Sequence, residues 1–146
     1  GPGIMEAANR GAARAGGKTI GMNISLPQAQ NANPYVTPEL SFSFHYFFMR
    51  KFWLTYKAKA VIIFPGGFGT LDEFFEIATL LQTSKISKKE LALVLYGEDY
   101  WRDLIKFDSM VKKGAICADD LKLFKVCSTP KAAFAYLKKR LLGSLG

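Results

Sequence analysis

The residues with the clearest chemical potential are a glycine-rich run, Pro65-Gly66-Gly67-Phe68-Gly69-Thr70, followed by Glu73. Glycines lack a Cβ atom, so they can adopt positive φ and let backbone N–H groups approach an anion closely. A helix predicted to begin at Leu71 would direct its positive N-terminal end at the same point. We therefore predict a phosphate-binding turn in which Thr70 caps the helix or offers its hydroxyl to a phosphate oxygen.

The context of this run is what makes the prediction specific. A glycine-rich turn alone is a weak signal, but this one follows a continuous apolar run, residues 60–64, that is typical of a strand buried on both faces. It precedes residues 71–82, where apolar side chains recur at helical spacing. The run contains no Walker lysine, because Thr70 and Leu71 follow Gly69, so an NTPase is disfavoured. The glycines also lack the spacing of the dinucleotide fingerprint.

Glu73 has two interpretations. Thr70-x-x-Glu73 is the pattern of a capping box, in which the carboxylate reaches back to the Thr70 amide. Glu73 could instead be a functional carboxylate beside a bound phosphate sugar. Replacement of Glu73 by Gln distinguishes the two interpretations. A capping box functions with Gln at this position, whereas a catalytic carboxylate would lose its activity.

The elements that must position these residues alternate along the chain. The predicted helices cover residues 5–15, 46–59, 71–82, 100–113 and 130–142, and the predicted strands cover residues 18–24, 40–44, 60–64, 91–96 and 121–126, with a loop over 25–38. Gly16 and Gly114 end helices, and Pro130 begins the last one. This alternation predicts one α/β domain with a parallel sheet, right-handed crossovers and helices on both faces. Ligands of such sheets bind at the carboxyl ends of the strands.

Composition narrows the class of protein. The chain has 146 residues, is 49% hydrophobic and carries a formal charge of +8. The excess of lysine and arginine fits a solvated surface that attracts small anions, and nucleic-acid binding is the weaker alternative. Cys117 and Cys127 form no CxxC pair and the single His is distant, so neither a metal site nor a disulfide is expected. We find no signal peptide or membrane span and expect a cytoplasmic protein.

The run Pro65-Gly66-Gly67-Phe68-Gly69-Thr70-Leu71-Asp72-Glu73 resembles the PGGxGTxxE motif of the Lonely Guy (LOG) family, which is often labelled lysine decarboxylase-like. Met49-Arg50-Lys51 resembles the arginine-lysine pair of the family. Residues 1–9, Gly1-Pro2-Gly3-Ile4-Met5-Glu6-Ala7-Ala8-Asn9, resemble the end of its first glycine-rich loop. Family domains begin with further strands, so we expect this chain to be the C-terminal portion of a longer domain.

The resemblance implies a Rossmann-like homodimer that needs no cofactor. Its reaction would be hydrolysis of the N-glycosidic bond of a nucleoside 5′-monophosphate, such as AMP or a cytokinin riboside monophosphate, to free base and ribose 5-phosphate. Arg50 and Glu73 would be catalytic. Phosphate and substrate would contact Gly1, Gly3, Met5, Glu6, Lys51, Pro65, Gly66, Gly67, Gly69, Thr70 and Glu76. Cleavage would pass through an oxocarbenium-like sugar, whose positive charge a carboxylate such as that of Glu73 would stabilise. A guanidinium such as that of Arg50 would bind an anionic group.

Several alternatives remain beside this interpretation. A non-catalytic nucleotide or phospho-ligand carrier of the same fold would share the turn. Lysine decarboxylation is not expected, because that chemistry normally needs a Schiff-base lysine with pyridoxal phosphate. Met5 could belong to the core instead of the pocket. The aromatic side chains of the helix over 46–59, namely Phe47, Phe48, Phe52 and Trp53, could fill the core or a dimer interface.

Overall fold

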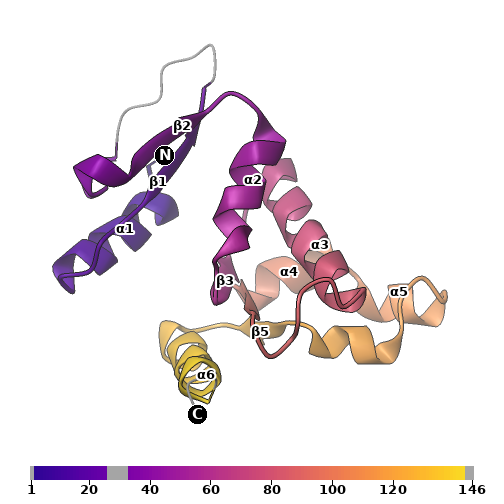
Figure 1. Ribbon diagram of the computed structural model, residues 1–146. Coiled ribbons are helices and arrows are strands. Elements are labelled where there is room, and N and C mark those ends of the chain that lie inside the picture. The colour runs from indigo at the N-terminus through magenta and orange to yellow at the C-terminus, as the bar shows by residue number, and fades with distance from the viewer. Residues whose placement is uncertain (1, 26–32, 144–146) are drawn as a thin grey trace. The chain divides into compact units, whose positions relative to one another are not determined.

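The computed structural model describes residues 2–25 and 33–143, which form two compact units. The first covers residues 1–57 and the second residues 58–146, and each is described below by itself (Figure 1). Both combine helices with parallel strands, as the alternating pattern predicts. Within the described residues, no helix combines the length and the hydropathy that crossing a bilayer requires.

The first unit pairs two short strands and two helices. It contains α1 (Ile4–Arg14), β1 (Gly21–Ile24), β2 (Ser41–Phe44) and α2 (Phe47–Tyr56). Strands β1 and β2 are parallel, with Gly21 opposite Ser41. The chain turns after α1 at Gly16, whose φ of 72° is in the left-handed region, so the predicted glycine stop is confirmed. Of the predicted loop over 25–38, residues 26–32 lie outside the described residues, and residues 33–37 form neither helix nor strand, as predicted.

The second unit is a three-stranded parallel sheet with helices on both faces. Its elements are β3 (Ala60–Ile63), α3 (Phe68–Gln82), β4 (Ala92–Tyr96), α4 (Glu98–Leu104), α5 (Phe107–Lys112), β5 (Lys125–Cys127) and α6 (Pro130–Leu142). The strand order is β3-β4-β5. Side chains alternate across β4, so Leu93 and Leu95 enter a core with Phe74, whereas Val94 packs with Ala133 of α6 on the opposite face.

The core on the first face is largely aromatic. Phe74 of α3 is fully buried, and its ring centroid lies 5.4 Å from that of Phe124 and 6.0 Å from that of Trp101. Ile77 and Leu81 follow Phe74 at helical spacing and are also buried. This stripe fixes the rotation of α3 about its axis, and therefore which of its side chains face away from the core.

The structure corrects three predicted elements. The predicted strand 60–64 is not buried on both faces, because Ile62 of the edge strand β3 is 38% exposed whereas residues 92–95 of β4 are buried. The predicted helix 100–113 is two helices, α4 and α5, separated at Ile105, where the backbone is extended. The predicted strand 121–126 is mostly wrong, because a 3₁₀ helix, Ala118–Lys122, precedes the short β5.

A helix cap in the second unit provides a stability test. The Oγ1 of Thr129 accepts a hydrogen bond from the N–H of Ala132 at 3.2 Å, and Pro130 begins α6 as predicted. We expect Thr129→Ala to lower the free energy of unfolding by about 1 kcal/mol, because the N–H loses its acceptor. Urea denaturation measures the change. Thr129→Ser keeps the hydroxyl and should recover most of the loss, whereas equal stability of both variants and the parent would contradict this role of the cap.

Candidate active site

The predicted glycine-rich turn joins β3 to α3 at the carboxyl end of the strand. Helix α3 begins at Phe68, with Gly67 as its N-cap, rather than at Leu71. Gly66 is required by close packing, since a Cβ there would lie 2.2 Å from Oγ1 and 2.9 Å from Cβ of Thr70. None of the three glycines of the turn has positive φ. Gly66 is therefore required by close packing on Thr70, not by an unusual backbone conformation.

The first N–H groups of α3 form an unsatisfied cluster of donors. No acceptor in the described part of the chain receives the N–H groups of Gly67, Phe68, Gly69 or Thr70, and the first bond of the helix runs from the Leu71 N–H to the Gly67 carbonyl at 3.0 Å. A Cβ placed on Gly67 or Gly69 would meet no atom within 4 Å. The Cβ positions of these two glycines thus border open space, next to N–H groups that suit an anion.

The electrostatics of this helix terminus differ from those of its neighbours. The first turn of α3 has neither an acidic residue nor a side-chain cap. By contrast, α4 has Glu98 and Asp99 in its first turn, and Thr129 caps α6. The positive end of the α3 dipole is therefore left without a negative group from its own first turn.

Glu73 and Glu76 lie beyond the turn on one flank of α3. Helical spacing of three and four residues puts them on the same side of the helix as Gly69. The capping-box interpretation of Glu73 is wrong, because Thr70 is the third residue of the helix and not its N-cap. Glu73 is half-buried and lies about 7.5 Å along the axis from Phe68, at 1.5 Å per residue. Thr70, the last of the unsatisfied donors, precedes Glu73 by three residues, or about 4.5 Å along the axis.

A second loop, after β4, supports the turn. Gly97 has a φ of 95°, and a Cβ there would lie 3.1 Å from Cγ of Pro65. The hydroxyl of Tyr100, in the first turn of α4, donates a hydrogen bond to the Gly66 carbonyl at 2.7 Å. Sequence reasoning did not single out Gly97 or Tyr100. The available signal was the glycine directly after a buried strand, since carboxyl ends of neighbouring parallel strands share one edge of the sheet.

The other predicted site residues belong to the first unit. Arg50 and Lys51 are half-buried on α2, and Nε of Arg50 donates to the carbonyl of Met22 in β1 at 3.0 Å. Gly3 is the N-cap of α1 with a φ of 84°, and Glu6 is in the first turn. Met5 is exposed and does not belong to the core. Gly1 lies outside the described residues.

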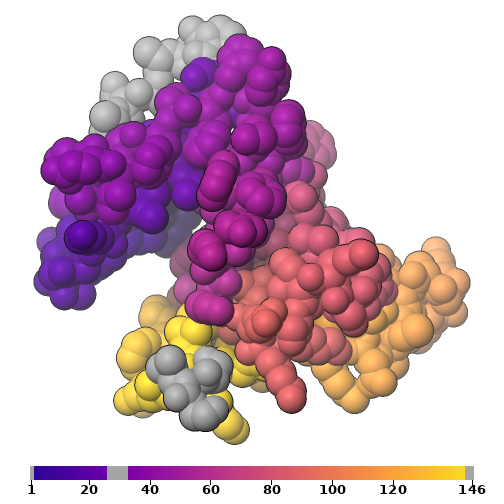
Figure 2. Space-filling model, viewed as in Figure 1, coloured from indigo at the N-terminus to yellow at the C-terminus, as the bar shows by residue number. Residues whose placement is uncertain are grey.

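The aromatic side chains of α2 are exposed, so the alternative in which they fill the core is wrong, whereas a dimer interface stays a prediction. Phe47, Phe48, Phe52 and Trp53 each keep at least 45% of their surface accessible, and α2 lies at the visible surface in Figure 2. Three of the rings near its C-terminal end contact each other, with Phe52 stacked on Tyr56 at 4.9 Å and edge-on to Trp53 at 5.4 Å.

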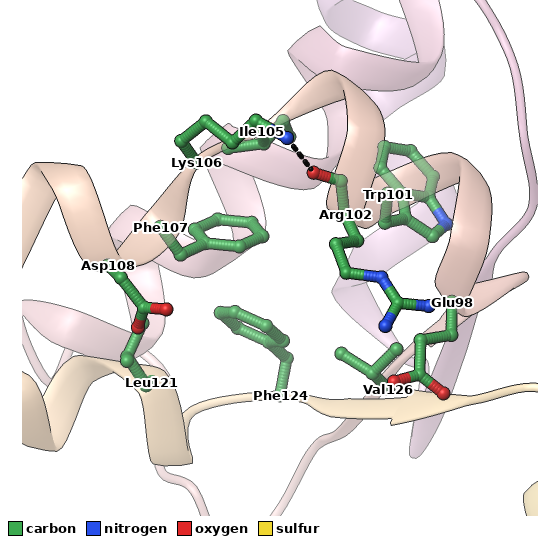
Figure 3. Close-up of a pocket in the computed structure, with 10 residues that line it drawn as sticks. All are labelled: Glu98, Trp101, Arg102, Ile105, Lys106, Phe107, Asp108, Leu121, Phe124 and Val126. Carbon is green, nitrogen blue, oxygen red and sulfur yellow. Dashed lines mark hydrogen bonds between the residues drawn. The ribbon is translucent and has the colours of Figure 1, made fainter.

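A cavity of about 350 Å³ in the second unit lies elsewhere (Figure 3). The rings of Phe107 and Phe124 lie next to each other in its lining, and Arg102 and Lys106 also line it. None of the predicted site residues lines this cavity. The candidate phosphate site is instead an open surface at the start of α3. Across the described residues, no cluster of three or more His, Cys, Asp or Glu could hold a metal ion.

Comparison with known proteins agrees with the motif at this turn. The family model described as "Possible lysine decarboxylase" matches residues 5–137. No curated protein matches the chain significantly. The match spans both units, including the glycine-rich turn, Glu73 and the Arg50-Lys51 pair. The chain therefore belongs to the lysine decarboxylase-like family, which is the LOG family of phosphoribohydrolases.

Proposed function

We propose that this protein hydrolyses the N-glycosidic bond of a nucleoside 5′-monophosphate, such as AMP or a cytokinin riboside monophosphate. The bond between C1′ of the ribose and the base nitrogen breaks, the oxygen of water bonds to C1′, and the base leaves with a proton. The products are the free base and ribose 5-phosphate. Membership of the family supports the reaction class. The observation that carries the phosphate requirement is the group of four N–H donors at the start of α3.

The turn would bind the 5′-phosphate. Four backbone donors and an uncompensated helix terminus favour a dianion, and they recognise it without a lysine. Thr70 packs its hydroxyl against Gly66, next to these donors, so it would add one more hydrogen bond. This arrangement supports a monophosphate, which presents one compact anionic group, as the anchor of the substrate.

Glu73 would act on the sugar. A ribose ring separates the 5′-phosphate from C1′, and about 7.5 Å of helix separates Phe68 from Glu73. Glycoside cleavage passes through an oxocarbenium-like sugar, which a carboxylate stabilises, and the same group can activate water. We assign Glu73 this role and Glu76, one turn further, a place at the edge of the substrate.

Arg50 is proposed as the second catalytic residue on the basis of the family motif. Its Nε bond to the Met22 carbonyl holds the base of the guanidinium against β1, so the side chain is oriented before substrate binds. A guanidinium suits a phosphate oxygen or a departing base that accumulates negative charge. Lys51, Gly3, Met5 and Glu6 are proposed as further substrate contacts from the same motifs.

We also propose a homodimer, with the exposed aromatic side chains of α2 in the contact between subunits. Exposed apolar patches of this kind commonly mark protein interfaces. Sedimentation at increasing protein concentration distinguishes a dimer from a monomer. A pyridoxal phosphate cofactor is not part of the proposal, because the motif residues 65–73 include no lysine to form its Schiff base.

The experiment that tests the function is incubation of the full-length protein with AMP, followed by chromatography for adenine and ribose 5-phosphate. We expect both products in equal amounts, at a rate proportional to enzyme concentration. Binding of AMP without release of adenine would contradict catalysis and favour a nucleotide carrier. Decarboxylation of lysine, or an absorption band of bound pyridoxal phosphate, would contradict the assigned chemistry.

A further inference from the structure

The segment after β4, which consists of Gly97 and the first turn of α4, makes two independent contacts with the glycine-rich turn. A Cβ atom added to Gly97 would lie 3.1 Å from Cγ of Pro65. The Tyr100 hydroxyl donates a hydrogen bond to the Gly66 carbonyl at 2.7 Å. Of these contacts, the hydrogen bond acts directly on a peptide group of the turn. Its acceptor belongs to the peptide that joins Gly66 to Gly67, and the N–H of that peptide is one of the four unsatisfied donors.

The planar geometry of the peptide group couples the direction of the Gly66 carbonyl to that of the Gly67 N–H. No peptide bond between described residues is cis, so the Gly66–Gly67 peptide is planar and trans, and its C=O and N–H point in opposite directions. A hydroxyl that holds the Gly66 carbonyl toward α4 therefore directs the Gly67 N–H away from α4. Two flanking glycines would otherwise leave this peptide free to rotate, since glycine restricts the backbone least.

Tyr100 is itself held by the core. Its ring packs edge-on against that of Trp101 at 5.1 Å between centroids. Trp101 is 1% exposed, and its Nε1 donates to the Tyr96 carbonyl at 2.9 Å. The hydroxyl is thus presented by a ring that packs on a buried residue, and it reaches the turn from the end of the neighbouring strand.

We propose that Tyr100 is a positioning residue that orients the Gly67 N–H toward the phosphate of the substrate. The inference rests on the proposed function, which supplies the phosphate. Because phosphate is bound in the ground state and in the transition state alike, loss of this orientation weakens binding without slowing bond cleavage.

The test is Tyr100→Phe, which removes the hydroxyl and keeps the ring on Trp101. We expect the Kd for inorganic phosphate and the KM for AMP to rise together by about two- to tenfold, as for loss of one hydrogen bond, with kcat changed by less than about twofold. Amide NMR of Gly67 during phosphate titration provides the binding curve. Tyr136→Phe, on α6, is the matched control and should change neither constant.

The outcomes separate the inference from the proposed function. If the unaltered protein binds phosphate and releases adenine while Tyr100→Phe leaves Kd and KM unchanged, the positioning role is wrong and the function stands. If kcat falls with a lowered melting temperature and an unchanged KM, Tyr100 is merely structural, which also overturns the inference. If the unaltered protein neither binds phosphate nor releases adenine, both fail together.

Discussion

Replacing Glu73 with Gln is expected to lower kcat for adenine release from AMP by about 10²- to 10⁴-fold, the usual contribution of a positioned acid or base. The substitution removes the charge that would stabilise an oxocarbenium-like sugar and keeps the size of the side chain. Gln and Glu have similar helix propensities, so α3 should persist. Steady-state kinetics with chromatographic detection of adenine measures the effect.

The structure makes this substitution more informative than the sequence pattern did. A capping box would tolerate Gln, but Thr70 is not the N-cap of α3, so that interpretation no longer competes. The Kd for inorganic phosphate should stay within about twofold of its original value, since the donors at Gly67 to Thr70 belong to the backbone. A variant that keeps more than a tenth of the original kcat would remove Glu73 from the mechanism.

Glu90→Gln is the matched control for this experiment. Glu90 is exposed and lies two residues before β4 begins, at the opposite end of the strands from the glycine-rich turn. The same change of charge there should leave kcat and KM unaltered. Equal losses in both variants would indicate that net charge, rather than the position of the carboxylate, governs activity.

Gly66→Ala is expected to destabilise the second unit by about 1–3 kcal/mol, the usual cost of forcing an extra methyl group into a packed site. The new Cβ would lie 2.2 Å from Oγ1 and 2.9 Å from Cβ of Thr70. Rotation of the Thr70 side chain moves Oγ1 but not Cβ, so the backbone must shift. Because that shift would move the unsatisfied N–H groups, we also expect loss of phosphate binding. Chemical denaturation and phosphate titration measure the two effects.

Gly69→Ala provides a contrasting variant within the same turn. A Cβ at Gly69 meets no atom within 4 Å, and Ala is a better helix former than Gly by about 0.5–1 kcal/mol. Stability should therefore be unchanged or higher. Its methyl group would occupy the open space beside the donors, so phosphate affinity should still fall. Equal destabilisation by the two alanines would contradict the assigned packing of Gly66 against Thr70.

The sequence by itself determined the α/β class, the family and the location of the turn. Those features depend on local patterns. Residues 91–96 form an apolar run long enough for a strand buried on both faces, and Phe74, Ile77 and Leu81 recur at helical spacing. Gly114 and Pro130 end and begin helices through their own backbone preferences, which need no distant contact.

Tertiary structure alone decided where α3 begins and which groups support its first turn. Gly69 is a poor helix former, so local propensity placed the start of the helix after Thr70. In the structure the helix instead starts at Phe68. Three contacts accompany this start: Thr70 packs closely on Gly66, Pro65 lies near Gly97, and the Gly66 carbonyl accepts a hydrogen bond from Tyr100. Tyr100 is 34 residues away along the chain from its acceptor, so no local pattern could identify it.

The break between α4 and α5 has the same origin. No glycine or proline marks Ile105, where the backbone becomes extended. After the break, the Phe107 ring lies 5.0 Å from that of Phe124 and 6.1 Å from that of Phe74. Burial of these rings offsets the loss of helical hydrogen bonds at the break. Propensity acts between neighbours in sequence, whereas packing joins residues that only the folded chain brings together.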